Sequence, residues 1–286
     1  MRIITFNVGL LDAWIFGKKI FEFTPYTRER AEALPSALGV LDCDIFFIQE
    51  IYHQADIARL HSYLVRVLPY SVHSKLPASR LRLGHGLAIY SKYPLREPMD
   101  TKFSRQLIDE GIVGPKGFVS AVLDVPQIGE IFVANAHTTA GGFFEHPESS
   151  KTDNCRTKQI QQLALTASRR SMYSILAGDL NCGPNVSKGV FDSLLQLGFK
   201  RPEDICCVPG LEPTWDPENP LNAKSPHRTS PPQRIDHVLF SDGLASRMDV
   251  TSVNRIFTED IEIAGRTHTI SDHYGLSVCA KSIPDV

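Results

Sequence analysis

The sequence predicts one α/β domain spanning residues 1–286, in which mostly antiparallel β-sheets pack between outer helices. Predicted strands outnumber predicted helices, and several strands follow one another through short turns, such as the Pro-Gln-Ile-Gly turn at 126–129. The helical segments carry apolar residues along one face, which suits helices that cover a sheet. The chain has 286 residues, of which 42% are apolar, and this is enough to form the buried core of one large domain.

The first two predicted strands each end at a polar side chain. Residues 3–8 read as an apolar core strand, and Asn7 lies near its end. Residues 44–50 form a continuous apolar run that terminates in Glu50, which is typical of a strand buried on both faces.

The remaining pattern alternates strands with a few helices. A helix is expected to begin at Thr27, as its N-cap, and Pro35 lies in the interior of that helix. The expected helices cover residues 27–41, 54–68, 154–170 and 187–197. Further strands are expected at 86–91, 117–125, 130–136, 174–177, 235–240, 250–256 and 275–280. Residues 202–232, rich in Pro, Asn and Ser, are expected to form a long ordered loop.

Composition narrows the classes of partner. The net charge of −2 arises from intermixed signs without a long basic run, which disfavours nucleic acid as a partner. The six cysteines include no Cys-x-x-Cys pair, and no apolar run reaches the roughly 18 residues of a membrane helix. The first residues read as a strand rather than a signal peptide, so a cytoplasmic or peripheral membrane location is expected, with signal-independent secretion left open.

Residues 10–26 break the strand pattern with a crowd of aromatic and aliphatic side chains around Lys18 and Lys19. An apolar loop folded back on its own domain is one interpretation. The other is a surface that touches lipid, with Trp14 and Phe16 buried at the interface and the lysines near head groups.

Polar residues that could carry chemistry recur at the predicted strand ends: Asn7, Glu50, His137, Asp179, Asn181, Asp236, Asp272 and His273. Carboxylate and amide oxygens suit Mg²⁺ better than zinc. The most specific local pattern is Gly-Asp-Leu-Asn at 178–181, which places an acid and an amide on the same side of an extended backbone. A turn rich in Asp and Asn is the alternative interpretation of that pattern.

Six short motifs occur in one order along the chain: Asn7 in Thr-Phe-Asn-Val, Gln49-Glu50, Asn135-x-His137, Gly178-Asp-Leu-Asn181, Arg234-Ile-Asp236 and Ser271-Asp-His273. In order and approximate spacing they resemble the endonuclease/exonuclease/phosphatase superfamily over residues 1–280. The resemblance implies a four-layer α/β/β/α sandwich with two mostly antiparallel sheets. It also implies hydrolysis of phosphate esters with a divalent metal ion.

The same resemblance implies a metal site. Glu50 would hold Mg²⁺, Asn7 would assist at the metal or the phosphate, and Asp272 would help at the metal or support His273. Mn²⁺ or Co²⁺ would be able to substitute for Mg²⁺.

The resemblance also assigns the proton-transfer groups. His273 would activate water, oriented by Asp236, while Asp179 would handle a proton or position the water; accounts of the family differ on which of the two is the base. Asn181 would act beside the phosphate, and His137 would stabilise charge on the phosphoryl oxygens. The residue types support hydrolysis independently of the family resemblance, because a His/Asp pair can deprotonate water while nearby donors stabilise the transition state.

Within the superfamily, the Ser-Asp-His-Tyr-Gly-Leu stretch at 271–276 resembles neutral sphingomyelinases more than abasic-site endonucleases. Eukaryotic members of that branch carry an Asp followed by Lys-Gly in a loop linked to switching of the site. Lys116 matches well, and Asp109 matches at a looser spacing, with Glu110 also available. A flexible turn with a solvated lysine is the alternative interpretation.

The predicted function is therefore a Mg²⁺-dependent phosphodiesterase of the phospholipase C type, acting on sphingomyelin or a related phospholipid at a membrane surface. Phe143 and Phe144 could border an apolar substrate entrance or anchor a buried loop. A nuclease or nucleotide phosphatase on the same site is the alternative. A catalytically inactive scaffold is a third hypothesis, which the completeness of the motif set disfavours.

Overall fold

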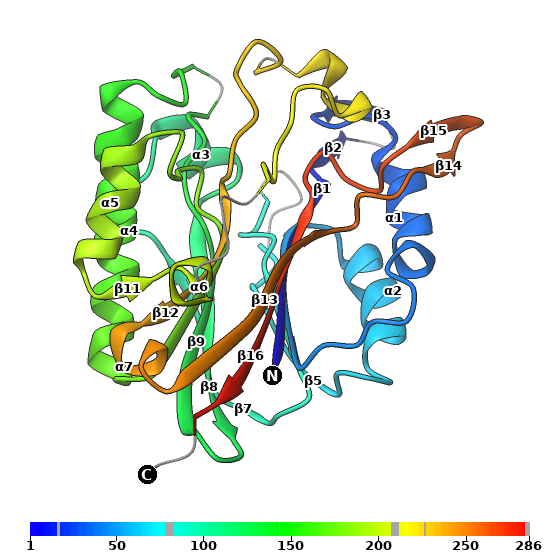
Figure 1. Ribbon diagram of the computed structural model, residues 1–286. Coiled ribbons are helices and arrows are strands. Elements are labelled where there is room, and N and C mark those ends of the chain that lie inside the picture. Colours follow the sequence, from blue (N-terminus) through cyan, green and yellow to red (C-terminus); the bar gives the residue numbers. More distant parts are fainter. Residues whose placement is uncertain (16–17, 78–82, 143, 207–211, 226, 284–286) are drawn as a thin grey trace.

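The computed structural model describes residues 1–15, 18–77, 83–142, 144–206, 212–225 and 227–283. Two six-stranded sheets pack face to face, and helices cover the outer face of each sheet (Figure 1). The predicted four-layer α/β/β/α sandwich is therefore confirmed.

The first sheet has one parallel pair among antiparallel neighbours, because β1 runs parallel to β4. Its strands, in spatial order, are β13 (Met248–Ile256), β16 (Gly275–Ser282), β1 (Arg2–Leu10), β4 (Ile45–Ile51), β6 (Ala88–Ser91) and β5 (Tyr70–His73).

The second sheet repeats this arrangement, with β9 and β10 as its parallel pair. Its strands, in spatial order, are β11 (Phe199–Lys200), β12 (Asp236–Ser241), β10 (Ser174–Asp179), β9 (Gly129–His137), β8 (Gly117–Val125) and β7 (Leu95–Lys102).

Two hairpins project from the sandwich, and the helices vary widely in length. The hairpins pair β2 (Asp12–Ile15) with β3 (Lys18–Glu22) and β14 (Ile261–Ile263) with β15 (Arg266–His268). The helices are α1 (Thr27–Ala37), α2 (Gln54–Leu64), α3 (Ile108–Val113), α4 (Ser150–Arg170), α5 (Lys188–Gln196), α6 (Pro202–Cys206), α7 (Asp242–Ala245) and the 3₁₀ helix η1 (Pro220–Lys224).

Three apolar clusters hold the layers together. The central cluster joins the facing sides of the two sheets through residues such as Ile3 and Val133. A second cluster packs α1 and α2 on the first sheet, and a third packs α4 and α5 on the second. Both parallel strands β1 and β4 are buried along nearly their whole length, as expected of strands covered on both faces.

The structure differs from the expectations mainly at segments without a strong apolar pattern. The segment at 10–26 is not a loop: β1 continues to Leu10 and a hairpin follows. The sequence reading missed β7, a sheet-edge strand with a register shift between Arg96 and Met99, because its polar residues and internal proline hide the alternation. The expected loop at 202–232 contains α6 and η1.

The first helix also begins and ends differently from the prediction. Thr27 is a helix residue rather than the cap, and its hydroxyl donates to the carbonyl of Thr24. Pro35 is tolerated inside α1, although it cannot donate to the carbonyl of Ala31. Arg59 from α2 donates to that carbonyl instead, at 3.5 Å. Among the described residues, no helix is long and apolar enough to cross a membrane.

Candidate active site

The polar residues at the predicted strand ends converge at one edge of the sandwich. Because β1 runs parallel to β4, the ends of both strands lie together, and Asn7 is opposite Gln49. The parallel pair β9 and β10 likewise places His137 opposite Asp179. β12 begins at the same edge, with Asp236 opposite Asp179.

Two buried amides fasten the sheets to each other directly beneath this edge. Gln49 donates through Nε2 to Asn135 Oδ1 at 2.7 Å and to Thr5 Oγ1 at 3.0 Å. Asn135 in turn donates to the carbonyls of Ile48 and Ala88. The pair therefore fixes the spacing between the strand that carries Glu50 and the strand that carries His137.

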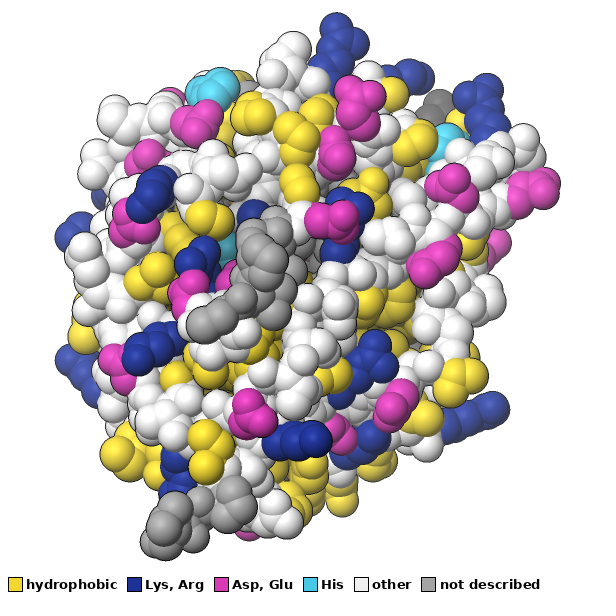
Figure 2. Space-filling view, in the orientation of Figure 1, with side chains coloured by type: hydrophobic (Ala, Val, Ile, Leu, Met, Phe, Trp, Pro, Cys, Tyr) yellow, Lys and Arg dark blue, Asp and Glu magenta, His cyan; other side chains and the backbone are white. Residues whose placement is uncertain are grey.

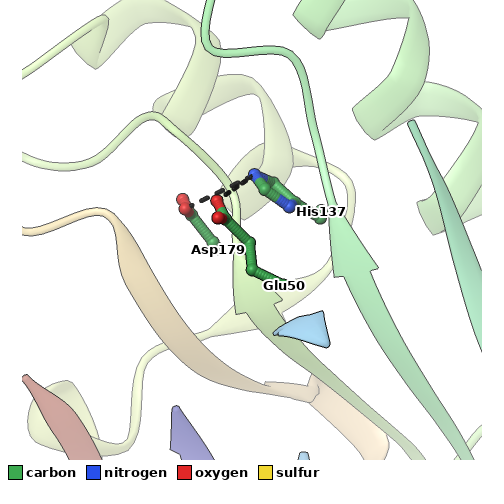
Figure 3. A group of neighbouring side chains, drawn as sticks. All are labelled: Glu50, His137 and Asp179. Atoms are coloured by element: carbon green, nitrogen blue, oxygen red, sulfur yellow. Dashed lines mark ion pairs between the residues drawn. The ribbon is translucent and has the colours of Figure 1, made fainter. Parts of the chain in front are cut away.

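Glu50, Asp179 and His137 form a compact cluster in which the three side chains point toward one another (Figure 3). His137 Nε2 lies 3.5 Å from Asp179 Oδ2 and 3.9 Å from Glu50 Oε1. Asn7 donates through Nδ2 to both carboxylates, at 3.2 Å to Glu50 and 3.0 Å to Asp179. Its Oδ1 accepts the amide of Gly9.

The backbone is held in unfavourable conformations at this cluster. Glu50 has a φ of 60° at the end of its strand, and Asn181 has a φ of 48°. Gly178 has a φ of 128°, and a Cβ atom there would lie 2.0 Å from the carbonyl oxygen of Ala136. Only glycine therefore allows β10 to approach β9 closely enough to present Asp179.

Burial sets the protonation of the cluster. It raises the pKa of Glu50, and together with the nearby charge of Asp236 it raises the pKa of Asp179 to about 7. Burial and then the positive charge of Lys116 lower the pKa of His137 well below its usual range. His137 is thus neutral, and its Nε2 accepts from Lys116 Nζ at 2.8 Å.

His273 and Asp236 form the expected pair, with His273 Nδ1 2.9 Å from Asp236 Oδ2. The other ring nitrogen, Nε2, lies 3.9 Å from Asp179 Oδ2. Burial alone lowers the pKa of His273, but the charge and hydrogen bond of Asp236 outweigh it and raise the pKa to about 10. The pair can therefore hold a proton beside Asp179.

Asp272 lines the same cavity but is held by its neighbours. Its Oδ2 accepts from the hydroxyl of Thr24 at 3.0 Å, and its Oδ1 accepts from Ser271 at 3.3 Å. A Cβ atom at Gly9 would lie 2.1 Å from Asp272 Oδ1, so glycine is needed there.

The remaining polar candidates divide between the site and its surroundings. Asn181 lines the cavity, its backbone amide donates to Asp179 Oδ1 at 2.9 Å, and its side chain donates to the carbonyl of Thr138. Lys116 reaches the cluster through His137. Asp109 is buried in α3, where its carboxylate lies against the backbone of Gly142.

A cavity of about 330 Å³ opens above the cluster, and its wall is largely apolar. Its apolar lining includes Leu11, Phe21, Phe23, Tyr52, Leu83, Val113, Val186, Trp215 and Ile235. Its polar lining includes Glu50, Glu110, Lys116, His137, Asp179, Asn181, Ser225, His227, Ser230, Gln233, Asp272 and His273. Its size lies within the range of small-molecule sites.

The aromatic candidates for membrane contact have different outcomes. Phe144 is 86% exposed and is absent from the described cavity lining, so it is not a buried loop anchor. Phe16 and Phe143 lie outside the described residues, as does the side chain of Trp14, whose backbone belongs to β2. Phe21 and Phe23 from the same hairpin region line the cavity.

The sequence reading missed several positioning residues. Asn219 and Asn222 donate to the carbonyls of Ser271 and Asp272, so the 212–225 segment supports the loop that carries His273. Arg30, fully buried in α1, donates to four backbone carbonyls around the same loop and the end of β1. In the sequence, the only sign of this role was that Arg30 lies beside Ala31 and Leu34 on the apolar face of the predicted helix.

The donor set fits a hard divalent cation. One ligand atom from each of Glu50, His137 and Asp179 lies within 4.8 Å of the others. Two carboxylates with a single imidazole suit Mg²⁺ or Mn²⁺ rather than a structural zinc site. In this geometry the amide nitrogen of Asn7 faces the carboxylates, so Asn7 orients them.

Comparisons with known proteins agree with this geometry. A family model described as the Endonuclease/Exonuclease/phosphatase family matches residues 4–273. A Drosophila melanogaster protein named "Putative neutral sphingomyelinase" is 24% identical over 295 residues, which cover 96% of this chain. The chain spans 60% of the length of that relative.

Several solved structures share the fold. Sphingomyelinase C from Streptomyces griseocarneus has 20% identity and a TM-score of 0.72, covering 97% of this chain and 98% of its own. A magnesium-bound mutant of beta toxin from Staphylococcus aureus has 16% identity and a TM-score of 0.73, covering 98% and 99%. D. rerio TDP2 with a single-strand DNA product has 18% identity and a TM-score of 0.71, covering 98% of each chain.

Proposed function

We propose, from the premise that the chain belongs to the endonuclease/exonuclease/phosphatase family, that it is a phosphodiesterase of the phospholipase C type. It hydrolyses sphingomyelin or a related phospholipid to a lipid alcohol and a phosphorylated head group. The observation that carries the proposal is the position of the Glu50, His137 and Asp179 cluster in a cavity with a largely apolar wall. The sphingomyelinase names among the relatives support the same substrate class.

The residues of the cavity divide the work on a phosphodiester. Bound Mg²⁺, held by Glu50 with Asn7 and Asp272 nearby, would offset phosphate charge and polarise the phosphoryl group. Lys116 and Asn181 lie in the cavity lining, where each can donate hydrogen bonds to the non-bridging phosphoryl oxygens.

Proton transfer is assigned to the histidine and its carboxylates. His273 carries a proton at neutral pH because its pKa is about 10, and it donates that proton from Nε2 to the leaving alkoxide while Asp236 holds the ring through Nδ1. Asp179, whose pKa of about 7 leaves it partly ionised at neutral pH, positions the attacking water and takes its proton. His137, neutral and buried, accepts from Lys116 through Nε2 and so holds the ammonium group where it can stabilise the developing negative charge.

The surface favours lipid over long nucleic acid. Lys and Arg side chains intermix with Asp and Glu over the face in Figure 2, in keeping with a net charge of −2. A duplex or long single strand would instead be expected to meet a continuous basic stripe.

A substrate panel tests the proposal. The purified chain with Mg²⁺ is offered vesicles of sphingomyelin or phosphatidylcholine, then abasic DNA, single-stranded DNA, RNA and inositol phosphates. We expect release of a phosphorylated head group that EDTA abolishes and His273→Ala lowers by at least about 100-fold. His146→Ala, which removes an exposed histidine, is the matched control. Cleavage of DNA without release of phosphocholine would overturn the lipid assignment.

Membrane contact is a separate part of the proposal. The sequence of residues 10–26 contains Trp14, Phe16, Lys18 and Lys19, and Phe21 and Phe23 of the same segment line the cavity. Trp14→Ala with Phe16→Ala is expected to weaken vesicle binding and turnover on vesicles while leaving soluble substrates unaffected. Met172→Ala, at a 70% exposed apolar residue, is the control. Unchanged binding by the double variant would refute this part.

A further inference from the structure

Glu110 places a buried carboxylate in the wall of the active-site cavity. It lies in α3 and is only 6% exposed. Its Oε1 accepts the backbone amide of Ala140 at 3.3 Å, whereas its Oε2 is buried and finds no hydrogen-bond partner among the described residues. No Lys, Arg or His that the structure describes forms an ion pair with Glu110.

A carboxylate in such a position is unfavourable unless something compensates it. Removing an ionised group from water without a partner costs several kcal/mol, and buried polar atoms left unsatisfied in a native fold often mark a functional role. Because Glu110 lines the cavity, the compensating group can enter with the ligand. A cation suits an acceptor-only side chain.

The aromatic ring of Tyr52 lies in the same wall. Tyr52 is 9% exposed, and its ring packs so closely on Gly86 that a Cβ atom there would lie 2.5 Å from it. Burial raises the pKa of Tyr52, and the charges of Glu50, Glu110 and Asp179 add to this effect. The Tyr52 ring is thus within electrostatic reach of Glu110 and of the carboxylates of Glu50 and Asp179.

The charges in the cavity are arranged with opposite signs at two places. Lys116 stands on the phosphate side, with its ammonium group on His137. Glu110 presents an unpaired acceptor elsewhere on the wall. This arrangement complements a zwitterionic head group, whose anionic phosphate and cationic ammonium are joined by two methylene groups.

We propose that Glu110 and Tyr52 form a subsite for the ammonium head group of the substrate. The carboxylate attracts the cation, and the aromatic ring favours a trimethylammonium group over a more hydrated one. The inference rests on the proposed function. It adds that phosphocholine-type substrates are selected over esters with neutral head groups through Glu110.

Two soluble substrates with the same leaving group test the subsite. One is p-nitrophenyl phosphocholine, and the other is p-nitrophenyl 3,3-dimethylbutyl phosphate, in which carbon replaces the cationic nitrogen. We expect the native enzyme to prefer the cationic ester in kcat/KM by about 10- to 100-fold. Glu110→Gln should reduce this ratio to within about threefold. Glu148→Gln, which removes an exposed carboxylate from the neighbouring segment, should keep the native ratio.

The possible outcomes distinguish failure of the proposed subsite from failure of the proposed phosphodiesterase function. A native ratio near one, or a native-like ratio in Glu110→Gln, overturns the subsite while the phosphodiesterase assignment stands. Equal loss on both substrates also overturns it, because Glu110 would then be only structural. If the native enzyme cleaves neither ester nor vesicle lipid, the proposed function fails.

A binding measurement keeps the subsite testable without turnover and without a folded Glu110 variant. Calorimetry with Mg²⁺ compares phosphocholine with 3,3-dimethylbutyl phosphate on the native protein and on Tyr52→Phe and Tyr52→Leu. Phosphocholine should bind about 10-fold tighter to the native protein and to the Phe variant, with a smaller preference in the Leu variant. Equal affinities for the two ligands on the native protein would refute the proposal.

Discussion

Arg30 offers the sharpest test of how the fold positions the site. Its guanidinium is fully buried and donates to the carbonyl of Pro25 at 3.0 Å, of Val8 at 2.9 Å and of Ile270 at 3.2 Å, and also to that of Gly9. These carbonyls belong to the end of β1, the turn before α1 and the segment before Ser-Asp-His. One side chain therefore ties together three segments that carry site residues.

Replacing Arg30 with Met would leave three buried carbonyls and one partly buried carbonyl without this donor. An unsatisfied buried polar group costs about 1–3 kcal/mol, and water entering the site would recover part of that cost. We expect a loss of about 4 kcal/mol in the free energy of unfolding, a large fraction of the usual 5–15 kcal/mol. Arg30→Lys keeps the charge but not the planar fork, so a loss of about 2 kcal/mol is expected.

Urea unfolding followed by circular dichroism measures both losses. The matched control is Arg28→Met in the same helix, where the native side chain is 77% exposed and pairs with Glu32. That exposed pair should contribute less than about 1 kcal/mol. If Arg30→Met loses less than about 1 kcal/mol, the carbonyl clamp does not stabilise the fold and the reasoning is wrong.

Three further variants probe the site and its support. Gly178→Ala would force a Cβ atom to 2.0 Å from a carbonyl oxygen, so the melting temperature should fall by about 10 °C, whereas Gly189→Ala, with open space around it, should not lower it; equal melting temperatures would contradict this. Burial lowers the pKa of His237 to about 3, and the unfolded chain binds that proton near pH 6.5. Stability should therefore fall by about 2 kcal/mol between pH 6.5 and 4.5, and His237→Gln should flatten this slope in urea titrations; an unchanged slope would exclude the residue as its source. Asp236→Asn should lower kcat by about 10²- to 10⁴-fold and move the NMR titration of His273 from about 10 toward its ordinary pKa; an unmoved titration would show that Asp236 does not set it.

The convergence of the polar candidates was predictable because these residues stand at the ends of predicted strands. Asn7 and Glu50 follow apolar runs, and parallel pairing of those strands brings them to the same edge. The Gly-Asp-Leu-Asn pattern likewise predicted where Asp179 would stand. Its glycine is required by the close approach of β9, a contact that no local pattern reveals.

Segments with weak local signals were predicted less well. The hairpin at 12–22 and the edge strand β7 depend on pairing partners rather than on strong alternation. Phe144 carries an apolar side chain like those of the core, yet it is 86% exposed. Its sequence neighbourhood contains nothing that distinguishes a buried anchor from a surface residue.

By itself, the sequence determined the layered α/β class and the oxygen-rich set of candidate ligands, whereas the pairing of Asp236 with His273 was implied by the family resemblance. The fold class and the ligand set follow from hydrophobic periodicity and from side-chain chemistry, which are local properties. Only the tertiary structure decided that Arg30 clamps three segments and that Glu110 faces the active-site cavity without a described partner. The surroundings of Arg30 and of Glu110 consist of atoms from segments that are distant in the sequence. Those segments come together only through long-range packing.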